Sequence, residues 1–390
     1  MVEMVKLKKA VDYSDSRISI NDVALENFVT TDNLLPNKLG LTTAVNLPPQ
    51  EGYMPSFQKD NILVGNIRPY LKKIWFSDRS GGCSADVLVF DVKKEYHPKY
   101  VYYAMFRDDF FDHMMRGSKG TKMPRGDKTH ILDFTIPKID PTRQKKIAAV
   151  LSSLDAKIEL NNRINAQLEA MAKTLYDYWF VQFDFPDKNG KSYRSSGGKM
   201  VYNKKLKREI PEGWEGKIIA NIATVKAGGD KPEIFSEEKT EIFSIPIFAN
   251  GTIDEGLYGY TNKATVDAPS ITISARGSIG YTVLRNKPFV PIIRLIVITP
   301  KNPIYTYFIY EYIKSIGFGK SGSVQQQLTS PMVSNMKIVY PSESLIKKFY
   351  RLTSGYTAMI QAIKEQNQQL AELRDWLLPM LMNGQAKICD

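Results

Sequence analysis

Two long stretches of this chain carry the same pattern of apolar residues, and this repetition constrains the fold more than any other feature of the sequence. Within each stretch, apolar residues recur at spacings of three, four or their sums, which predicts an amphipathic helix. We expect these helices at residues 142–183 and 342–384. At a shift of 202 positions the stretches match, aligning Ile158, Asn165, Leu168 and Leu175 with Ile360, Asn367, Leu370 and Leu377. One structural unit is therefore present twice.

Each predicted helix is roughly 60 Å long at 1.5 Å per residue, far beyond the average helix of a globular domain. An apolar stripe of that length needs a partner, and the other copy supplies one. Because a folded segment separates the helices, we expect an antiparallel coiled coil with a globular domain at either end. The alternative is that each helix lies on its own domain. The expected helix-pairing residues are Leu154, Ile158, Asn165, Leu168, Leu175, Ile360, Asn367, Leu370 and Leu377.

The rest of the chain predicts two globular domains of the α+β class, at residues 1–141 and 214–341. Short apolar runs between turn residues are typical of strands, and they include residues 62–64, 87–90, 271–274, 281–284 and 292–299. Aromatic-rich segments predict short helices at residues 100–111 and 305–316. The order of the strands does not follow from the sequence.

A basic segment at residues 184–213 stands between the two halves. It holds eight Lys and Arg residues and no acidic residue between Lys188 and Arg208, together with Gly and Ser residues that predict an exposed linker. Such a linker is either simply solvated or in contact with phosphates. The whole chain has 53 basic and 41 acidic side chains, a net charge of +12 that favours a polyanionic partner.

The composition excludes several classes of protein. A 43% hydrophobic share with 11% aromatic residues is typical of a folded, globular chain. Two cysteines and three histidines are too few and too scattered for a zinc cluster, so we expect no metal. The N-terminus is charged where a signal peptide is apolar, and no apolar run approaches the ~18 residues of a membrane span. We therefore expect a cytoplasmic protein.

No motif for catalysis or for a cofactor stands in the chain. Residues 317–322 resemble part of a Walker loop, but Lys314 occupies the position of its first glycine. The segment Asn302–Tyr305 is similar to the Asn-Pro-Pro-Tyr motif of amino-methyltransferases but lacks the second proline. No glycine-rich loop for S-adenosylmethionine accompanies it. By elimination we expect a non-catalytic binding protein with no cofactor of its own.

Cationic loops that contain glycine recur in both globular segments. Residues 116–125 and 317–327 each precede a long helix, and residues 65–70 and 275–280 each place an arginine in a turn after a strand. Glycine lets the backbone approach a phosphate, whereas Arg, Lys and Gln can bind phosphates or base edges. Turn geometry alone is the alternative explanation for the glycines. The candidate DNA-binding residues are Arg68, Lys119, Lys122, Arg125, Arg276, Lys320, Ser323, Gln325, Gln326 and Gln327.

This layout resembles the specificity subunit of type I restriction-modification systems over nearly the whole chain. Three pieces carry the resemblance: Ile210–Trp214 at the opening of the second globular segment, Ala275–Gly280 inside it, and Ile136-Pro137 followed by Gln144–Ala148 at the entry to the first helix. No single piece is distinctive, but the order of the pieces and their duplication are. The first segment departs from the pattern, since Asp15–Ile18 replaces the Pro-x-Gly-Trp entry and Arg68–Tyr70 replaces Gly-Ser-Ile-Gly.

The resemblance implies a non-catalytic subunit with two target recognition domains, each reading one half of a bipartite, asymmetric DNA site in the major groove. It implies that the helices set the length of the spacer and dock two methyltransferase subunits, which bind S-adenosylmethionine and methylate adenine at N6. Motor-endonuclease subunits that use ATP and Mg²⁺ would join them. The expected partners are therefore double-stranded DNA and these subunits, with no membrane.

A protein-binding coiled-coil scaffold without DNA recognition is the alternative from a different class. The basic segment and the cationic loops disfavour it. Binding to random duplex DNA separates the two, because neutralised phosphates give a steep dependence on salt.

Overall fold

The computed structural model describes residues 3–48, 52–267, 269–318, 327–386 and 388. The chain divides into two compact units. Unit 1 combines Met1–Asn162 with Lys364–Asp390, and unit 2 is the continuous stretch Arg163–Ile363. Two long helices, α4 (Pro141–Tyr176) and α8 (Glu343–Met382), each contribute one part to unit 1 and the other part to unit 2.

Each unit is built around a four-stranded antiparallel sheet, and the order of the strands is the same in both. In unit 1 the order is β2 (Val11–Tyr13), β9 (Val87–Val92), β6 (Ile62–Gly65) and β7 (Ile74–Phe76). In unit 2 it is β14 (Ala223–Ala227), β20 (Ile296–Pro300), β17 (Ser270–Ile273) and β18 (Thr282–Arg285). All residues of β6 and of β17 are buried, because apolar or small residues occupy consecutive positions.

A second sheet accompanies the antiparallel sheet of each unit, and both second sheets contain one parallel strand pair. In unit 1 its order is β3 (Arg17–Ser19), β5 (Tyr53–Phe57), β8 (Gly81–Cys83) and β4 (Phe28–Val29), with β4 parallel to β8. In unit 2 its order is β16 (Leu257–Thr261), β15 (Ile245–Phe248) and β19 (Val290–Pro291), with β15 parallel to β19.

Short helices and a two-stranded ribbon complete each unit. The helices of unit 1 are α1 (Pro98–Phe106), α2 (Asp108–Arg116) and α3 (Lys128–Leu132); those of unit 2 are α5 (Ile219–Ile222), α6 (Thr306–Ile316) and α7 (Ser330–Ser334). The ribbons pair β1 (Met4–Lys6) with β10 (Thr135–Pro137) and β13 (Glu215–Ile218) with β21 (Lys337–Tyr340). Strands β10 and β21 lead directly into α4 and α8, so the ribbon ties the start of each globular part to a long helix.

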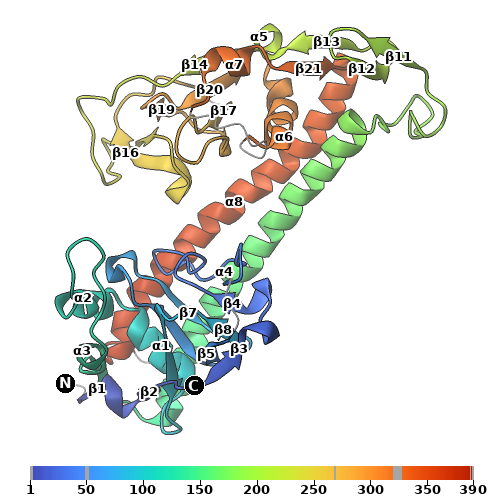
Figure 1. Ribbon diagram of the computed structural model, residues 1–390. Coiled ribbons are helices and arrows are strands. Elements are labelled where there is room, and N and C mark those ends of the chain that lie inside the picture. Colours follow the sequence, from blue (N-terminus) through green and yellow to red (C-terminus); the bar gives the residue numbers. More distant parts are fainter. Residues whose placement is uncertain (1–2, 49–51, 268, 319–326, 387, 389–390) are drawn as a thin grey trace. The chain divides into compact units, whose positions relative to one another are not determined.

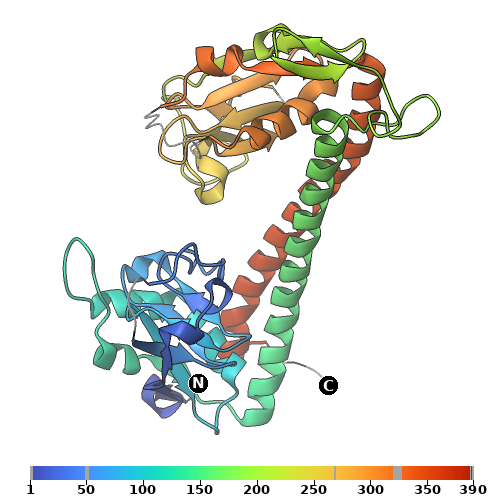
Figure 2. The same cartoon turned by 45° about the vertical axis from the view of Figure 1, so that its right-hand side comes forward.

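The two long helices lie side by side and antiparallel within each unit (Figures 1 and 2). In unit 1 the end of α8 packs against the start of α4, and one buried cluster includes Ile147, Leu151, Leu378, Leu381 and Met382. In unit 2 the end of α4 packs against the start of α8, and the buried cluster there includes Tyr176, Trp179, Phe180, Ile346 and Phe349. Apolar burial therefore holds the helices together in both units.

Backbone geometry interrupts two of the expected elements. The helix expected at residues 100–111 is broken at Arg107, where φ is −66° and ψ is 148°, into α1 and α2. The strand expected at residues 292–299 begins only at Ile296, because Ile293 and Arg294 have positive φ angles of 50° and 59°. Helix α4 passes at its end into a π-helical turn, Asp177–Val181.

None of residues 188–208 is buried, as expected of an exposed segment, but the basic segment at residues 184–213 is folded and not a simple linker. It contains a hairpin of β11 (Met200–Asn203) and β12 (Arg208–Pro211). The ring of Phe185 stacks on Trp214 with centroids 5.0 Å apart, and Ile210 is fully buried. The hairpin and the packing at the two ends of the segment were not predicted, because charged residues dominate the composition whereas a few apolar residues carry the packing. None of the helices in the described ranges has both the length and the apolarity needed to cross a membrane.

Candidate nucleic-acid interface

Two loops of unit 1 meet where strand β6 ends. The N–H of Arg68 donates to the carbonyl oxygen of Pro124 at 2.8 Å. Beside this bond, Ile67 and Arg125 form an isolated antiparallel bridge. The structure therefore joins the two stretches that the sequence singled out in this half, residues 65–70 and 116–125.

Arg125 is held through its backbone and its side chain. Its N–H donates to the carbonyl oxygen of Lys119, and its own carbonyl oxygen accepts from the N–H of Lys119, both at 3.0 Å. The guanidinium Nη2 lies 3.0 Å from Oδ1 of Asp86. The carbonyl oxygen of Asp86 in turn accepts from the N–H of Asn66 at 2.8 Å. The Arg125 side chain is thus fixed in direction although it is 60% exposed.

Asp127 connects the second loop to helix α3. Its Oδ1 accepts from the N–H groups of Thr129 and His130, both at 3.0 Å, and so caps the helix. Lys119 places its Nζ 3.1 Å from Oδ2 of Asp127. The pKa of Asp127 is lowered, first by the N–H of His130 and then by Lys119. Asp127 therefore compensates part of the charge of Lys119, whose side chain remains 84% exposed.

Two stacked histidines close the base of this loop. The rings of His113 and His130 are 4.1 Å apart between centroids and only 7° from parallel. Nε2 of His113 lies 2.7 Å from the carbonyl oxygen of His130, and Nε2 of His130 lies 3.1 Å from that of His113. Gly117 lies so close that a Cβ atom there would be 2.1 Å from the His130 ring, so only glycine fits.

Arg68 and Lys122 are exposed on the same pair of loops. Arg68 adopts the left-handed conformation, with φ of 53° and ψ of 63°, directly before Pro69. A proline favours an extended backbone at the residue before it, so Pro69 does not account for this conformation. The candidate residues of unit 1 are therefore Arg68, Lys119, Lys122 and Arg125, all exposed on neighbouring loops.

Unit 2 brings the corresponding loops together after strand β17. The N–H of Leu328 donates to the carbonyl oxygen of Ala275 at 3.0 Å. Nη2 of Arg276 donates to Oε1 of Gln327 at 3.0 Å. Gly280 packs against Phe318, where a Cβ atom would be only 2.5 Å from that side chain. The candidates Arg276 and Gln327 therefore meet, whereas Lys320, Ser323, Gln325 and Gln326 lie outside the described residues.

Polar contacts between α4 and α8 fix how the helices pair in unit 1. Nδ2 of Asn161 donates to Oε1 of Gln366 at 2.7 Å and to Oδ1 of Asn367 at 2.8 Å. Nδ2 of Asn367 donates to Oδ1 of Asn162 at 2.8 Å. Asn161 is 1% exposed, so both of its contacts are shielded from water. The predicted residue Asn367 thus takes part in pairing, together with Asn161, which the repeat did not reveal because Ile363 stands at the corresponding position.

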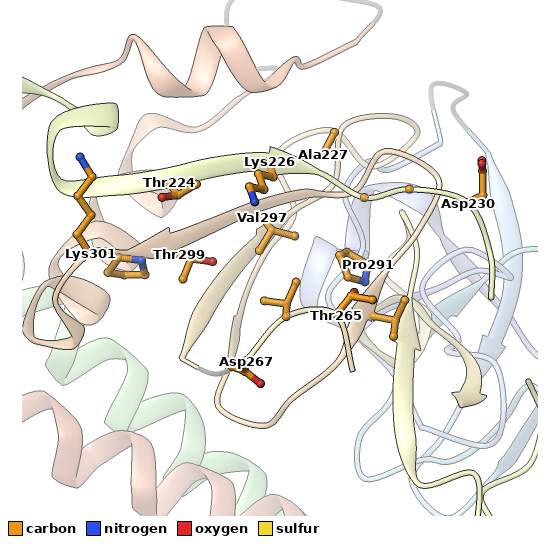
Figure 3. A pocket seen from close by; sticks show the side chains of 15 residues that line it. Thr224, Lys226, Ala227, Asp230, Thr265, Asp267, Pro291, Val297, Thr299 and Lys301 are labelled. Carbon is orange, nitrogen blue, oxygen red and sulfur yellow. The ribbon is translucent and has the colours of Figure 1, made fainter. Parts of the chain in front are cut away.

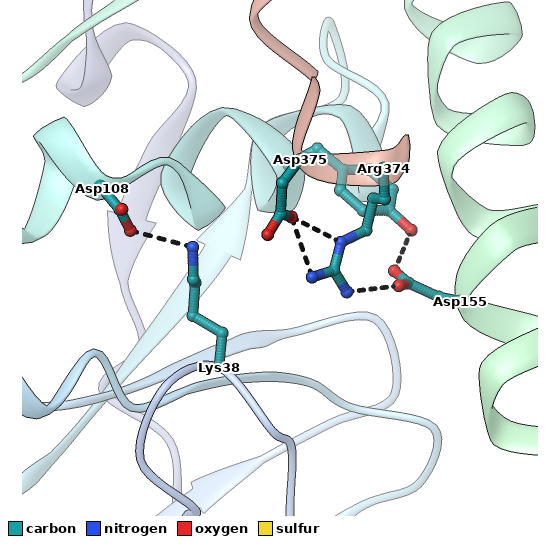
Figure 4. A network of polar contacts seen from close by, with 6 residues as sticks. Lys38, Asp108, Asp155, Arg374 and Asp375 are labelled. Carbon is teal, nitrogen blue, oxygen red and sulfur yellow. Dashed lines mark hydrogen bonds and ion pairs between the residues drawn. The ribbon is translucent and has the colours of Figure 1, made fainter. Parts of the chain in front are cut away.

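An ion pair deeper in unit 1 also joins the helices (Figure 4). Nη1 of Arg374 in α8 lies 2.8 Å from Oδ1 of Asp155 in α4, and the guanidinium covers the Phe106 ring at 4.5 Å. The hydroxyl of Tyr103 donates to Oδ2 of Asp155 at 2.5 Å. In the same view Lys38 pairs with Asp108 at 2.9 Å, at the start of α2.

The predicted helix-pairing residues are buried or half-buried in each unit. Leu168 is 8% exposed and Asn165 is 9% exposed, both in the unit 2 part of α4. The described residues offer no hydrogen-bond partner to Oδ1 of Asn165. Half-buried positions complete the set, namely Leu154, Ile158, Leu175, Ile360, Asn367, Leu370 and Leu377.

A cavity of about 570 Å³ in unit 2 lies beside the edge strand β14 (Figure 3). Lys226 and Lys301 line it together with Asp230 and Asp267. None of the predicted site residues lines it, so it is separate from the candidate interface. Within the described ranges, no group of three or more His, Cys, Asp or Glu residues is placed to hold a metal ion.

Sequence reasoning missed the residues that hold the candidate side chains in place. Asp127 stands directly before α3, and an aspartate there is a recognisable N-cap signal. Asp86 gave no such signal, because its contact with Arg125 depends on how β6 and β9 pair. Asp86 is 39 positions from Arg125 in sequence, so only the folded sheet brings the two together.

Comparisons with known proteins agree with this arrangement. The family model described as type I restriction modification DNA specificity domain matches residues 49–170 and 211–372. The type I restriction enzyme MjaIX specificity subunit of Methanocaldococcus jannaschii is 27% identical over 312 residues, covering 74% of this chain and 69% of its own. The HindI specificity subunit of Haemophilus influenzae is 23% identical and covers 92% of this chain and 94% of its own.

A solved structure shares the fold. The crystal structure of a type I restriction-modification system S subunit from M. genitalium covers 100% of this chain and 97% of its own, with a TM-score of 0.58 and 16% identity. The family model spans well over half of the chain, in two regions that correspond to its two repeats. The resemblance stated from the sequence is thereby confirmed, and the chain belongs to the family of type I restriction-modification DNA specificity domains.

Proposed function

We propose that this chain is the DNA specificity subunit of a type I restriction-modification system and that each unit reads one half of a bipartite DNA site. One observation carries the proposal. Two sheets with the same strand order each present a joined pair of loops with exposed cationic residues, after the corresponding strands β6 and β17. A protein-binding scaffold has no need of such duplicated cationic loops, so it is not favoured.

The chain acts in this proposal by binding, not by catalysis. Methyltransferase subunits dock on α4 and α8 and methylate adenine, and motor-endonuclease subunits complete the assembly in the cytoplasm. S-adenosylmethionine, ATP and Mg²⁺ belong to those partners. In this chain Lys122 neutralises a phosphate, which positions the loops on DNA without reading its sequence.

The long helices set the distance between the half-sites in this proposal. Helices of 36 and 40 residues are roughly 54 to 60 Å long at 1.5 Å per residue. One turn of B-DNA is about 34 to 36 Å. The asparagine contacts between Asn161 and Asn367 keep the helices in one register, so the distance is defined rather than variable.

The proposal is tested by mapping N6-methyladenine across a genome in cells that express this chain with its methyltransferase subunits, and in cells without the chain. A bipartite motif should depend on the chain. Exchanging residues 16–141 or 214–341 for those of a relative should change one half of the motif only. A motif that changes in both halves, or in neither, contradicts independent reading by the two units.

Insertion into both helices tests the spacer. Seven residues inserted between Asn162 and Arg163, and seven between Ile363 and Lys364, keep the heptad pattern and leave the described contacts within each unit intact. They add roughly 10 Å at 1.5 Å per residue, about three base-pair steps. We expect the same half-sites with a longer spacer.

The control inserts the same seven residues in the exposed turn between Asn189 and Gly190 and should leave the spacer unchanged. A spacer that stays fixed in a folded, active helix variant would show that the helices do not set the distance.

A further inference from the structure

We propose that Arg125 and Arg276 each read a guanine, one in each half-site, and that Asp86 and Gln327 are the positioning residues that hold them. The proposal rests on the function proposed above and assigns chemistry to it. It follows from a feature that the two units share: an exposed arginine on a joined loop pair has its guanidinium fixed by a side chain from another segment.

The fixed direction of the guanidinium favours a base edge as its ligand. Guanine presents O6 and N7, two acceptors side by side in the major groove, which match the fork of an arginine. Adenine presents one donor and one acceptor there, so it does not match. A phosphate also matches the fork of an arginine, but a lysine binds it as a point charge without a fixed direction, so a phosphate depends less on such positioning.

The charge next to Arg125 also favours a base. Asp86 lies 3.0 Å from the guanidinium, so a phosphate bound at Arg125 would meet a carboxylate at close range. Like charges at such distances repel, whereas a base edge carries no net charge. The contact to Asp86 uses Nη2 and leaves other N–H groups of the guanidinium for the base.

The contact in unit 2 changes the role expected of Gln327. An adenine-reading glutamine needs its amide oxygen for the base as well as its nitrogen. Oε1 of Gln327 already accepts from Arg276 at 3.0 Å. We therefore assign the reading of the base to Arg276 and the positioning of that arginine to Gln327.

The test uses the full chain with its methyltransferase subunits. The methylated motif is mapped for the parent and for Arg125→Lys, Arg276→Lys and Asp86→Asn. Arg125→Lys keeps the charge but loses the fork, so one G·C position should relax in one half-site while the other half-site and the spacer stay unchanged. Arg276→Lys should relax one G·C position in the other half-site. Asp86→Asn should relax the same position as Arg125→Lys, to a smaller degree.

A modified base tests the contact directly. In a duplex with the mapped motif, 7-deazaguanine at the assigned position removes the N7 acceptor and retains the base pair. Binding by the parent should weaken about 2- to 12-fold, because one of the two bonds of a bidentate base contact is lost. Arg125→Lys cannot fork across O6 and N7 and should show a smaller loss with the modified base. The control Lys122→Ala should bind all duplexes more weakly and keep the parental motif.

The outcomes separate this proposal from the proposed function. A parent that yields no bipartite motif overturns the proposed function. The assignment to guanine is overturned if the parent yields a bipartite motif and neither arginine variant changes it. It is also overturned if an arginine variant relaxes the motif at an A·T position. If Arg125→Lys has a lower melting temperature than the parent, its loss of specificity could come from lost stability. The motif of Asp86→Asn then decides whether Arg125 reads the base, because Asp86→Asn retains the arginine.

Discussion

Corresponding positions of unit 1 and unit 2 share a place in the fold but not a side chain. At the shift of 202 positions, Tyr176 at the end of α4 and Trp179 and Phe180 in the π-helical turn after it align with Leu378, Leu381 and Met382 at the end of α8. All six are buried where the end of one helix meets the start of the other. Unit 2 fills this place with aromatic rings and unit 1 with aliphatic chains, so the fold depends on burial here and not on the identity of the side chain.

The same comparison at the short helices shows a larger chemical difference. Pro98 opens α1 and Pro303 stands at the corresponding place before α6. Eight residues later unit 1 has Phe106, which is 1% exposed, and unit 2 has Glu311, which is 4% exposed. Unit 2 therefore buries a carboxyl where unit 1 buries a ring. A duplicated scaffold can accept such exchanges in its core while its strand order stays the same.

The largest expected effect comes from emptying the corresponding helix-end positions. Trp179→Ala should lower the free energy of unfolding of unit 2 by about 3–5 kcal/mol, and Leu381→Ala should lower that of unit 1 by about 2–5 kcal/mol. Hydrogen exchange measured unit by unit checks this, since each variant should weaken protection mainly in its own unit.

Trp376→Ala is the matched control, because that tryptophan of α8 is 57% exposed and should matter little. Equal loss of protection in both units from either core variant would show that the two clusters do not stabilise their units separately.

Glu311 should make unit 2 sensitive to pH in a way that unit 1 is not. Burial, aided by Glu169 and Asp177, raises the pKa of Glu311 from 4.5 to about 7, although Lys314 opposes the shift. The native carboxyl keeps its proton to a higher pH than the unfolded one. Its contribution therefore favours folding below about pH 4.5 and is lost as the pH rises through about 7.

Raising the pH through this range should lower the free energy of unfolding by roughly 3 kcal/mol, at about 1.36 kcal/mol per pKa unit. Urea unfolding at pH 5 and pH 8 should show that Glu311→Gln removes this part of the pH dependence. Glu159→Gln, a change of an exposed residue in α4, should retain it. A pH dependence that is the same in Glu311→Gln and in the parent would contradict the burial of an ionisable carboxyl.

The smallest effect concerns Asn165 and Asn367, the two asparagines that align in the repeat. Replacing each with leucine should change the free energy of unfolding in opposite directions. Asn367 accepts from Asn161 and donates to Asn162, so Asn367→Leu should cost about 1 kcal/mol. Oδ1 of Asn165 is buried without a hydrogen-bond partner among the described residues, so Asn165→Leu should stabilise by about 1 kcal/mol. Thermal melting of both variants checks the signs. Stabilisation by Asn367→Leu would mean that its contacts do not contribute to pairing.

The sequence predicted those parts of the fold that depend on local periodicity. The apolar spacing around Leu168 and Leu370 was enough to predict two long helices, and it placed them within a few residues of α4 and α8, apart from the π-helical turn after Tyr176. The order of strands was out of reach, because the pairing of β6 with β9 joins segments whose contacts are not local. The exposure of the basic segment was predicted correctly for residues 188–208, whereas its packing at Phe185 and Ile210 was not, because these apolar residues are few among many charges.

The sequence predicted which kind of loop forms the candidate site, but not the contacts that hold its side chains. Arg125 and Arg276 were recognisable because glycine and cationic residues recur at matching places. Asp86 gave no signal in the sequence, and Gln327 was predicted as a DNA-binding residue but not as the partner of Arg276, since only the folded chain brings each partner close to its arginine. Antiparallel pairing of the helices over their full length, and the borders of the two recognition domains, stay predictions.

Unit 1 is discontinuous in sequence, and this determines the order in which the two units can complete their folding during synthesis. Unit 2 is continuous from Arg163 to Ile363, whereas the core of unit 1 requires Leu378, Leu381 and Met382 from the end of α8. Residues 1–162 leave the ribosome first, yet at about 5–20 residues per second they wait on the order of 10 to 40 s for those side chains. Unit 2 can therefore be complete while unit 1 still exposes the apolar start of α4, including Ile147 and Leu151, to chaperones and proteases.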